Sequence, residues 1–177
     1  GVQTFMYQLN TMSGTNGQAP FISLYMHLED VPEGKDRDDL AMVCRKIFEQ
    51  RIVGLKNASG AYVSPAFPKI LYVLDEDNIH EDSKYWDLTV LAATCTSKRM
   101  VPDYISAKIM RELKDGNVYG CMGCRSFLTV GYVDKKDPWK MTTKKKGIPK
   151  FPGRFNQGVV TINLPDVALS SKGDIEK

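Results

Sequence analysis

Short apolar runs alternate with longer segments of helical periodicity along this chain. Residues 69–74 form a continuous apolar run after a proline, which is typical of a strand buried on both faces. Residues 36–55 and 84–95 repeat apolar side chains at helical spacing, and residues 102–113 do so again. Because strands that alternate with helices pack as a mostly parallel sheet, the sequence predicts an α/β fold or part of an α/β barrel.

Three further segments, 2–9, 20–28 and 158–164, are predicted strands, and residues 10–17 between the first two are rich in turn formers. The chain begins without a methionine, directly in a strand-like segment, and ends in a polar tail at 170–177. We therefore expect it to be a piece of a longer protein.

The composition bounds the size and the class of the protein. A chain of 177 residues, with 42% hydrophobic and 10% aromatic residues, can bury one core, so we expect a single partial domain over residues 1–177. No apolar run approaches the roughly 20 residues that cross a bilayer, and the first residues lack the features of a signal peptide. The expected compartment is the cytoplasm, with no membrane partner.

Lysines gather between residues 134 and 152: Lys135, Lys136, Lys140, Lys144, Lys145, Lys146 and Lys150. Such a run can bind phosphate or nucleic acid, and it is also the ordinary composition of a solvated loop. Trp139 and Phe151 lie within it. The sequence lacks the regular alternation of basic and aromatic residues that is typical of proteins binding single-stranded nucleic acid. We expect a basic loop here, and a basic nucleic-acid-binding module stays open as an alternative.

The chain has four cysteines, which are too few and too unevenly spaced for a secreted disulfide framework. Cys121 and Cys124 form a C-x-x-C pattern beside two glycines and an arginine. This pattern allows half of a zinc site, a dithiol redox centre, or two thiols with separate roles. Buried, inert thiols fit poorly in such a glycine-rich setting.

Each alternative makes its own demand on the rest of the chain. Zinc would need two more ligands, yet Cys44 and Cys95 lie in predicted helices. His27 and His80 each lack a paired ligand nearby in the sequence. A dithiol centre needs a helix directly after it, whereas residues 125–130 have the pattern of extended chain. A small dithiol oxidoreductase remains an alternative.

Two motifs together are more specific. Met-Gly-Cys-Arg-Ser-Phe-Leu at 122–128, followed by Gly-Arg-Phe-Asn-Gln-Gly-Val-Val-Thr-Ile-Asn-Leu-Pro at 153–165, resembles the active-site core of the anaerobic (class III) ribonucleoside-triphosphate reductases, which are glycyl radical enzymes. Residues 9–14 with 17–21, and residues 98–106, are similar to segments that precede this core in the same family. The resemblance spans nearly the whole chain and implies a partial ten-stranded α/β barrel of the glycyl radical enzyme and ribonucleotide reductase type.

The resemblance also implies roles for individual residues. Cys124 matches the cysteine that becomes a transient thiyl radical and removes the hydrogen from the ribose 3′ carbon. Asn156 matches an asparagine that assists as the 2′ hydroxyl leaves as water, because an amide can donate and accept hydrogen bonds without a charge. Asn156 could instead only stabilise a turn before Gly158. Gly123, Arg125 and Ser126 would shape the loop beside the ribose and bind the substrate.

The cofactors and partners implied by the resemblance lie mostly elsewhere. They are a ribonucleoside triphosphate substrate, formate or a thioredoxin-like reductant, and a radical S-adenosylmethionine iron–sulfur activating enzyme that makes a glycyl radical near the C-terminus. ATP and deoxynucleotide effectors, a structural zinc and a homodimeric full-length protein are also implied. Residues 1–177 match neither the glycyl radical loop, the ATP cone nor the zinc-binding cysteine cluster. We therefore expect no cofactor within this segment, and no activity from it alone.

Overall fold

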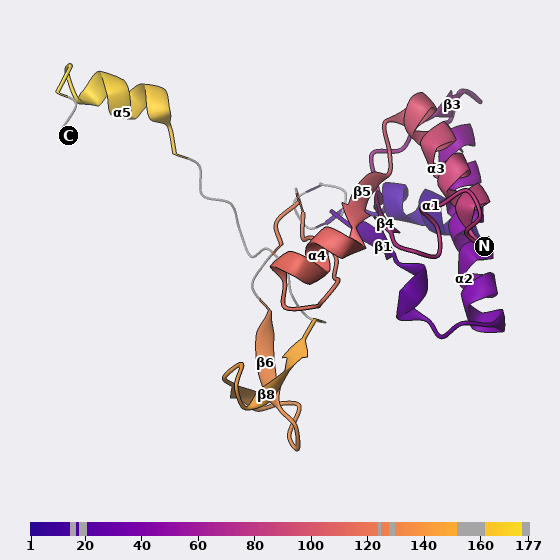
Figure 1. Ribbon diagram of the computed structural model, residues 1–177. Helices are drawn as coiled ribbons and strands as arrows, with labels where there is room; N and C mark the ends of the chain where they lie inside the picture. The colour runs from indigo at the N-terminus through magenta and orange to yellow at the C-terminus, as the bar shows by residue number, and fades with distance from the viewer. Residues whose placement is uncertain (15–16, 18–20, 124, 128–129, 152–161, 175–177) are drawn as a thin grey trace. The chain divides into compact units, whose positions relative to one another are not determined.

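The computed structural model describes residues 1–14, 17, 21–123, 125–127, 130–151 and 162–174 (Figure 1). The chain divides into two compact units, Gly1–Leu128 and Thr129–Lys177. The α/β class predicted from the sequence is confirmed. The described residues form three small sheets and no closed barrel.

A three-stranded parallel sheet lies at the centre of the first unit. Its strands, in spatial order, are β1 (Ser23–Met26), β4 (Lys69–Leu74) and β5 (Asp103–Ser106). Both pairings are parallel, as the sequence predicted. The four inner residues of β4 are buried, which confirms the strand predicted to be covered on both faces.

Two long helices cover one face of this sheet (Figure 1). They are α2 (Lys35–Val53) and α3 (Trp86–Arg99), and they confirm the helices predicted at 36–55 and 84–95. Each carries acidic residues in its first turn and basic residues in its last, which suits the helix dipole. Their buried faces meet the sheet in one core, formed by Met26, Leu28, Ala41, Cys44, Ile47, Phe48, Ile70, Tyr72, Tyr85, Leu88, Ala92 and Cys95.

The opposite face of the sheet is covered in a different way. Leu71, Val73 and Ile105 are buried without belonging to the helix-side core, because alternate residues of a strand point to opposite faces. Tyr25 shares that face, and a Cβ built at Gly120 would lie 3.0 Å from its ring. The chain just before the C-x-x-C motif therefore lies against the face that α2 and α3 leave uncovered.

The prediction of a strand at residues 2–9 is wrong, because this segment is helix α1 (Val2–Thr11). Met6 and Leu9 are its buried residues, and their spacing places both on one helical face. The apolar side chains of this segment follow a period of 3.6 rather than 2, so the helix was readable in the sequence.

The single helix predicted at 102–113 is also corrected. The segment divides into strand β5 and helix α4 (Ala107–Leu113). Ser106 caps the helix, since its side-chain oxygen accepts a hydrogen bond from the amide of Ile109. Pairing with β4 holds the preceding residues extended, which local periodicity cannot reveal.

Smaller elements complete the first unit: the 3-10 helix η1 (Leu28–Asp30) and the antiparallel pair β2 (Leu55–Lys56) and β3 (Tyr62–Val63). The strand predicted at 20–28 corresponds to β1, which is shorter, and to η1 after it. Asn57 stabilises the turn from β2 to β3, because its Oδ1 accepts hydrogen bonds from the amides of Ser59 and Ala61.

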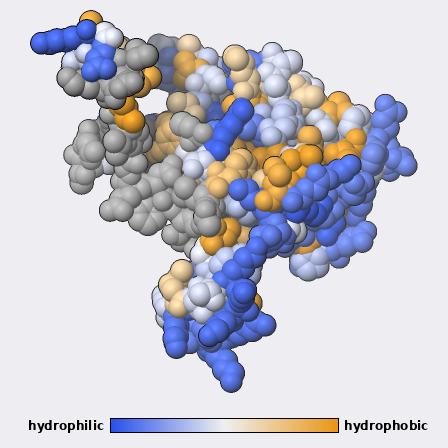
Figure 2. Space-filling view, turned by 60° about the vertical axis from the view of Figure 1, so that its left-hand side comes forward, coloured by the Kyte–Doolittle hydropathy of each residue, from blue (hydrophilic) through white to orange (hydrophobic). Residues whose placement is uncertain are grey.

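The described residues of the second unit form an antiparallel sheet in the order β7–β6–β8 and one short helix. Its elements are β6 (Gly131–Asp134), β7 (Met141–Thr142), β8 (Gly147–Lys150) and α5 (Leu164–Ser170). The stretch predicted as a basic loop at 134–152 thus contains two of these strands, and Figure 2 shows hydrophilic side chains gathered on the small sheet. The strand predicted at 158–164 falls largely outside the described residues.

Among the described helices, none is both long and apolar enough to cross a membrane.

Candidate active site

The residues around Cys124 form a tight turn. The amide of Met122 donates a hydrogen bond to the carbonyl of Ser126 at 2.8 Å, and the amide of Ser126 donates one back at 3.2 Å. Gly123 has a φ of 59° and Arg125 a φ of 68°, a left-handed conformation that glycine adopts freely and arginine only at a cost. Cys124 itself lies outside the described residues, so its role stays a prediction.

Two charged side chains of the sheet hold this turn. Lys69 Nζ donates a hydrogen bond to the Gly123 carbonyl at 3.3 Å, and Arg125 Nη2 donates one to Asp103 Oδ1 at 2.8 Å. Lys69 and Asp103 also form an ion pair of 2.9 Å. Because they are the first residues of β4 and β5, they place the turn at the amino-terminal edge of the parallel sheet.

The charges of this cluster stabilise one another. Burial alone would raise the pKa of Asp103, but the contacts with Arg125 and Lys69 outweigh burial and lower it. The pKa of Arg125 is raised by its hydrogen bond to the same carboxylate. Asp103 is therefore an anion that both cations share.

The structure brings together three of the five predicted site residues. Gly123, Arg125 and Ser126 all belong to the turn, and the guanidinium of Arg125 is bound to Asp103. Their contact with substrate stays a prediction. Asn156 lies outside the described residues, so its proximity to the turn is also still a prediction.

The other cysteines occupy buried positions. Cys44 and Cys95 lie within α2 and α3, as predicted, and both belong to the helix-side core. Burial raises the pKa of the Cys44 thiol to about 12 and raises that of Cys95 as well. Cys121 is also a free, buried cysteine. Cys44 and Cys95 are thus built into the packing, which disfavours them as zinc ligands.

A second polar cluster, which sequence reasoning missed, lies at the carboxyl edge of the sheet. His27 Nδ1 lies 2.8 Å from Asp30 Oδ1, and His27 Nε2 lies 3.0 Å from Asp75 Oδ2. Arg111 donates two hydrogen bonds to Asp75, at 2.8 and 2.6 Å, and one to Glu29 at 3.0 Å. His27 thus has two carboxylate partners in the folded chain, and one of them, Asp75, is 48 residues away in the sequence.

A signal for this cluster was present in the sequence. His27 directly follows β1, and Asp75 directly follows β4. Polar side chains that follow neighbouring parallel strands meet at one edge of the sheet, where α/β proteins commonly place their binding sites. The positions of His27 and Asp75 after their strands therefore indicate that the two side chains meet at this edge.

The cluster has the composition of a metal site, because ligand atoms of His27, Glu29 and Asp75 lie within 4.8 Å of one another. Its bonding argues against that use. Both ring nitrogens of His27 face carboxylates, and the raised pKa of His27 favours a protonated ring, which cannot coordinate a cation. Arg111 supplies a second positive charge to the same carboxylates, so the network is a structural one.

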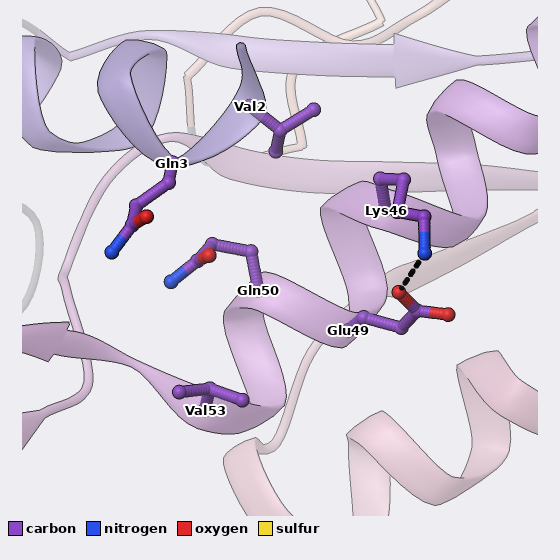
Figure 3. A pocket seen from close by; sticks show the side chains of 6 residues that line it. All are labelled: Val2, Gln3, Lys46, Glu49, Gln50 and Val53. Atoms are coloured by element: carbon purple, nitrogen blue, oxygen red, sulfur yellow. Dashed lines mark hydrogen bonds and ion pairs between the residues drawn. The ribbon is translucent and has the colours of Figure 1, made fainter.

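Two surface hollows lie apart from these clusters. The first, of about 380 Å³, lies between α1 and α2 and is lined by Val2, Gln3, Lys46, Glu49, Gln50 and Val53 (Figure 3). Its two charged residues pair with each other at 2.7 Å. The second, of about 350 Å³, lies on the small sheet beside Trp139, with Lys150 Nζ 5.6 Å from the indole ring centre. Neither contains a predicted site residue.

The fold and the site define an α/β protein whose parallel sheet carries a cysteine turn beside a glycine, and ion pairs and hydrogen bonds of Lys69, Asp103 and Arg125 tie this turn to the strands. The family model for anaerobic ribonucleoside-triphosphate reductase matches residues 1–177. This chain therefore belongs to the anaerobic ribonucleoside-triphosphate reductase family. The match gives no support to a separate dithiol oxidoreductase or nucleic-acid-binding module.

Curated relatives agree with this assignment. The anaerobic ribonucleoside-triphosphate reductase of Enterobacteria phage T4 is 37% identical over 171 residues, which cover 96% of this chain and 25% of the relative. The enzymes of Escherichia coli K12 and Haemophilus influenzae are 34% and 32% identical, over 97% of this chain and 21% of each relative. The chain thus spans a quarter or less of the length of these relatives.

Proposed function

We propose that the protein reduces ribonucleoside triphosphates to deoxyribonucleoside triphosphates under anaerobic conditions, and that these residues supply the cysteine turn of its active site. The reaction would provide deoxyribonucleotides for DNA replication, in the cytoplasm. The match of the family model to all 177 residues carries the proposal. The turn at 122–126 supports it, because Gly123 and Arg125, the two sequence neighbours of Cys124, are both bound to charged residues of the sheet.

In the proposed mechanism, Cys124 acts first as a thiyl radical. It takes a hydrogen atom from the ribose 3′ carbon, which leaves a thiol on the protein and a radical on the sugar. A sulfur radical suits this step because its S–H bond is close in strength to the sugar C–H bond, so that the transfer is reversible. The same cysteine can then return the hydrogen atom at the end of the cycle.

Loss of the 2′ hydroxyl follows. The hydroxyl takes a proton and departs as water, with Asn156 proposed to hold the 2′ and 3′ oxygens by hydrogen bonds. Two electrons are then needed to complete the reduction. Formate, oxidised to carbon dioxide, or a thioredoxin-like protein would supply them.

The radical must come from outside the described turn. We propose that the parts of the protein corresponding to the uncovered length of the relatives hold the glycyl radical, the structural zinc and the ATP and deoxynucleotide effector sites. We also propose that a radical S-adenosylmethionine activating enzyme generates the radical, and that the whole protein is a homodimer. In this proposal the parallel sheet β1–β4–β5 is part of a ten-stranded α/β barrel.

The substitution Cys124→Ser in the full-length protein tests the assignment. We expect ribonucleotide reduction to be abolished, because an alkoxyl radical does not form under the conditions that generate a thiyl radical. The glycyl radical should still appear in the electron paramagnetic resonance spectrum after activation. Retained turnover would show that Cys124 is not the radical site. Ser97→Ala, a substitution of an exposed residue in α3, serves as a control with unchanged turnover.

A further inference from the structure

Lys69 and Asp103 connect the sheet to both sides of the cysteine position. Lys69 donates its hydrogen bond to the carbonyl of Gly123, at 3.3 Å, and Asp103 accepts one from Arg125, at 2.8 Å. Gly123 and Arg125 are the residues directly before and after Cys124 in the chain. Support from the sheet therefore reaches the turn through both neighbours of the proposed radical site.

The register of the sheet explains why the two supporting side chains meet. Asp103 lies opposite Leu71, and Lys69 precedes Leu71 by two residues, so both charged side chains point to the same face. Their side chains are only 20% and 18% exposed, and their charged atoms lie 2.9 Å apart. Salt screens a partly buried pair less than an exposed one. The pairing of β4 with β5 thus brings the two supporting side chains together without any contact from the turn.

The turn itself needs such support. Its backbone is closed by the pairing of Met122 with Ser126, and it includes Arg125 in the left-handed region. A bulky residue in that region costs free energy and persists only where the surroundings impose it. The hydrogen bonds between Met122 and Ser126 close this backbone, and the ion pair between Arg125 and Asp103 adds a contact from the sheet.

We propose that Lys69 and Asp103 are positioning residues that hold the Cys124 turn in the geometry required for hydrogen transfer. This inference rests on the proposed function and adds to it the part of the sheet on which the turn depends. Neither side chain needs to touch the substrate, because each acts through Gly123 or Arg125. Positioning of this kind matters, since a misplacement of about 1 Å can reduce a rate on the order of 100-fold.

The test uses Lys69→Met and Asp103→Asn in the full-length, activated enzyme. Both substitutions remove a charge and nearly preserve the size of the side chain. We expect kcat for ribonucleoside triphosphate reduction to fall about 10- to 100-fold in each variant. KM should change by less than about threefold in Lys69→Met, because Lys69 binds the backbone carbonyl of Gly123 rather than a side chain predicted to bind substrate. The glycyl radical signal after activation should match that of the wild type.

Two further measurements separate positioning from general damage to the fold. Lys69→Arg and Asp103→Glu keep the charges and should recover most of the lost turnover. Amide hydrogen exchange in the peptide 119–127 should be faster in the Met and Asn variants than in the wild type. The control is Lys84→Met, which breaks the exposed ion pair with Asp38 and should change neither turnover nor exchange.

Several outcomes would overturn the inference. They are turnover within about twofold of wild type in both neutral variants, conservative variants no better than the neutral ones, or a loss of the glycyl radical signal. Cys124→Ser belongs in the same series of measurements. Activity in that variant would overturn the proposed function itself. An inactive Cys124→Ser beside a fully active Lys69→Met would overturn the positioning inference alone.

Discussion

His27 is a buried side chain whose charge stabilises the fold at the carboxyl edge of the sheet. Burial alone would lower the pKa of His27, but the contacts with Asp30 and Asp75 outweigh it and raise the pKa above the ordinary value of 6.5. The folded state therefore holds the proton more tightly than the unfolded state. This contribution to stability is fully present below about pH 6.5, and it is lost as the pH rises through the raised pKa of the folded state.

The substitution His27→Gln tests this reasoning. At pH 6 we expect it to lower the free energy of unfolding by about 2 kcal/mol, because Asp30 and Asp75 lose a charged partner. The difference from wild type should narrow at pH 9, where His27 is neutral. Urea denaturation of this chain at both pH values, followed by circular dichroism, measures both quantities. If the difference in free energy of unfolding between His27→Gln and wild type were the same at both pH values, His27 would not be charged at pH 6.

His80→Gln is the matched control for this experiment. His80 pairs with Glu76 at 3.2 Å, but both side chains are largely exposed, and exposed pairs contribute little to stability. We expect its unfolding curve to follow that of the wild type at both pH values.

At the scale of elements, the end of α2 depends on a glycine. Gly54 ends the helix with a φ of 89°, and its amide donates a hydrogen bond to the carbonyl of Gln50 at 2.8 Å. A Cβ at this position would lie 2.5 Å from the backbone oxygen of Val63 in β3. The glycine therefore allows both the left-handed turn and the close approach of the β2–β3 hairpin.

Gly54→Ala should destabilise the protein by about 3 kcal/mol, since it adds a steric clash to the cost of the positive φ. Gly60→Ala measures the cost of the positive φ without the clash, because Gly60 has a φ of 83° and only the flexible end of Lys56 nearby. That control should lose about 1 kcal/mol. Thermal unfolding of both variants measures the difference. Equal losses would show that the approach of Val63 is unimportant.

At the scale of the whole molecule, the two units differ in how much apolar surface they bury. The core described for the first unit lies between the sheet and two helices, whereas α5 of the second unit exposes most of its large side chains. Leu164 is 70% exposed and Leu169 is 78% exposed. Contiguous exposed apolar surface favours association when nothing covers it, and open sheet edges add to the effect.

We expect the 177-residue chain to self-associate at micromolar concentrations. The double substitution Leu164→Gln and Leu169→Gln should shift the chain towards a monomer, because it removes apolar surface from α5. Ser170→Gln, which removes none, should leave the association unchanged. Size-exclusion chromatography with light scattering measures all three. A compact monomer for the unsubstituted chain would contradict the prediction.

The sequence alone determined the elements whose pattern is local. The periodicity of 36–55 and 84–95 and the apolar run at 69–74 correctly predicted α2, α3 and β4, because burial on one face leaves its period in the chain. The motifs at 122–128 and 153–165 together indicated the reductase family, and the family model confirms it. The same reasoning failed at 2–9, where the period was misread, and at 102–113, where pairing with a distant strand decided the structure.

Only the tertiary structure decided which charged residues support the cysteine turn. Lys69 is 54 residues from Gly123 in the chain, and His27 is 48 residues from Asp75. No local spacing encodes such contacts, since they depend on the order and register of the strands. The physical reason is that periodicity records which side of an element is buried, whereas the packing of the sheet selects the partners that meet at its edges.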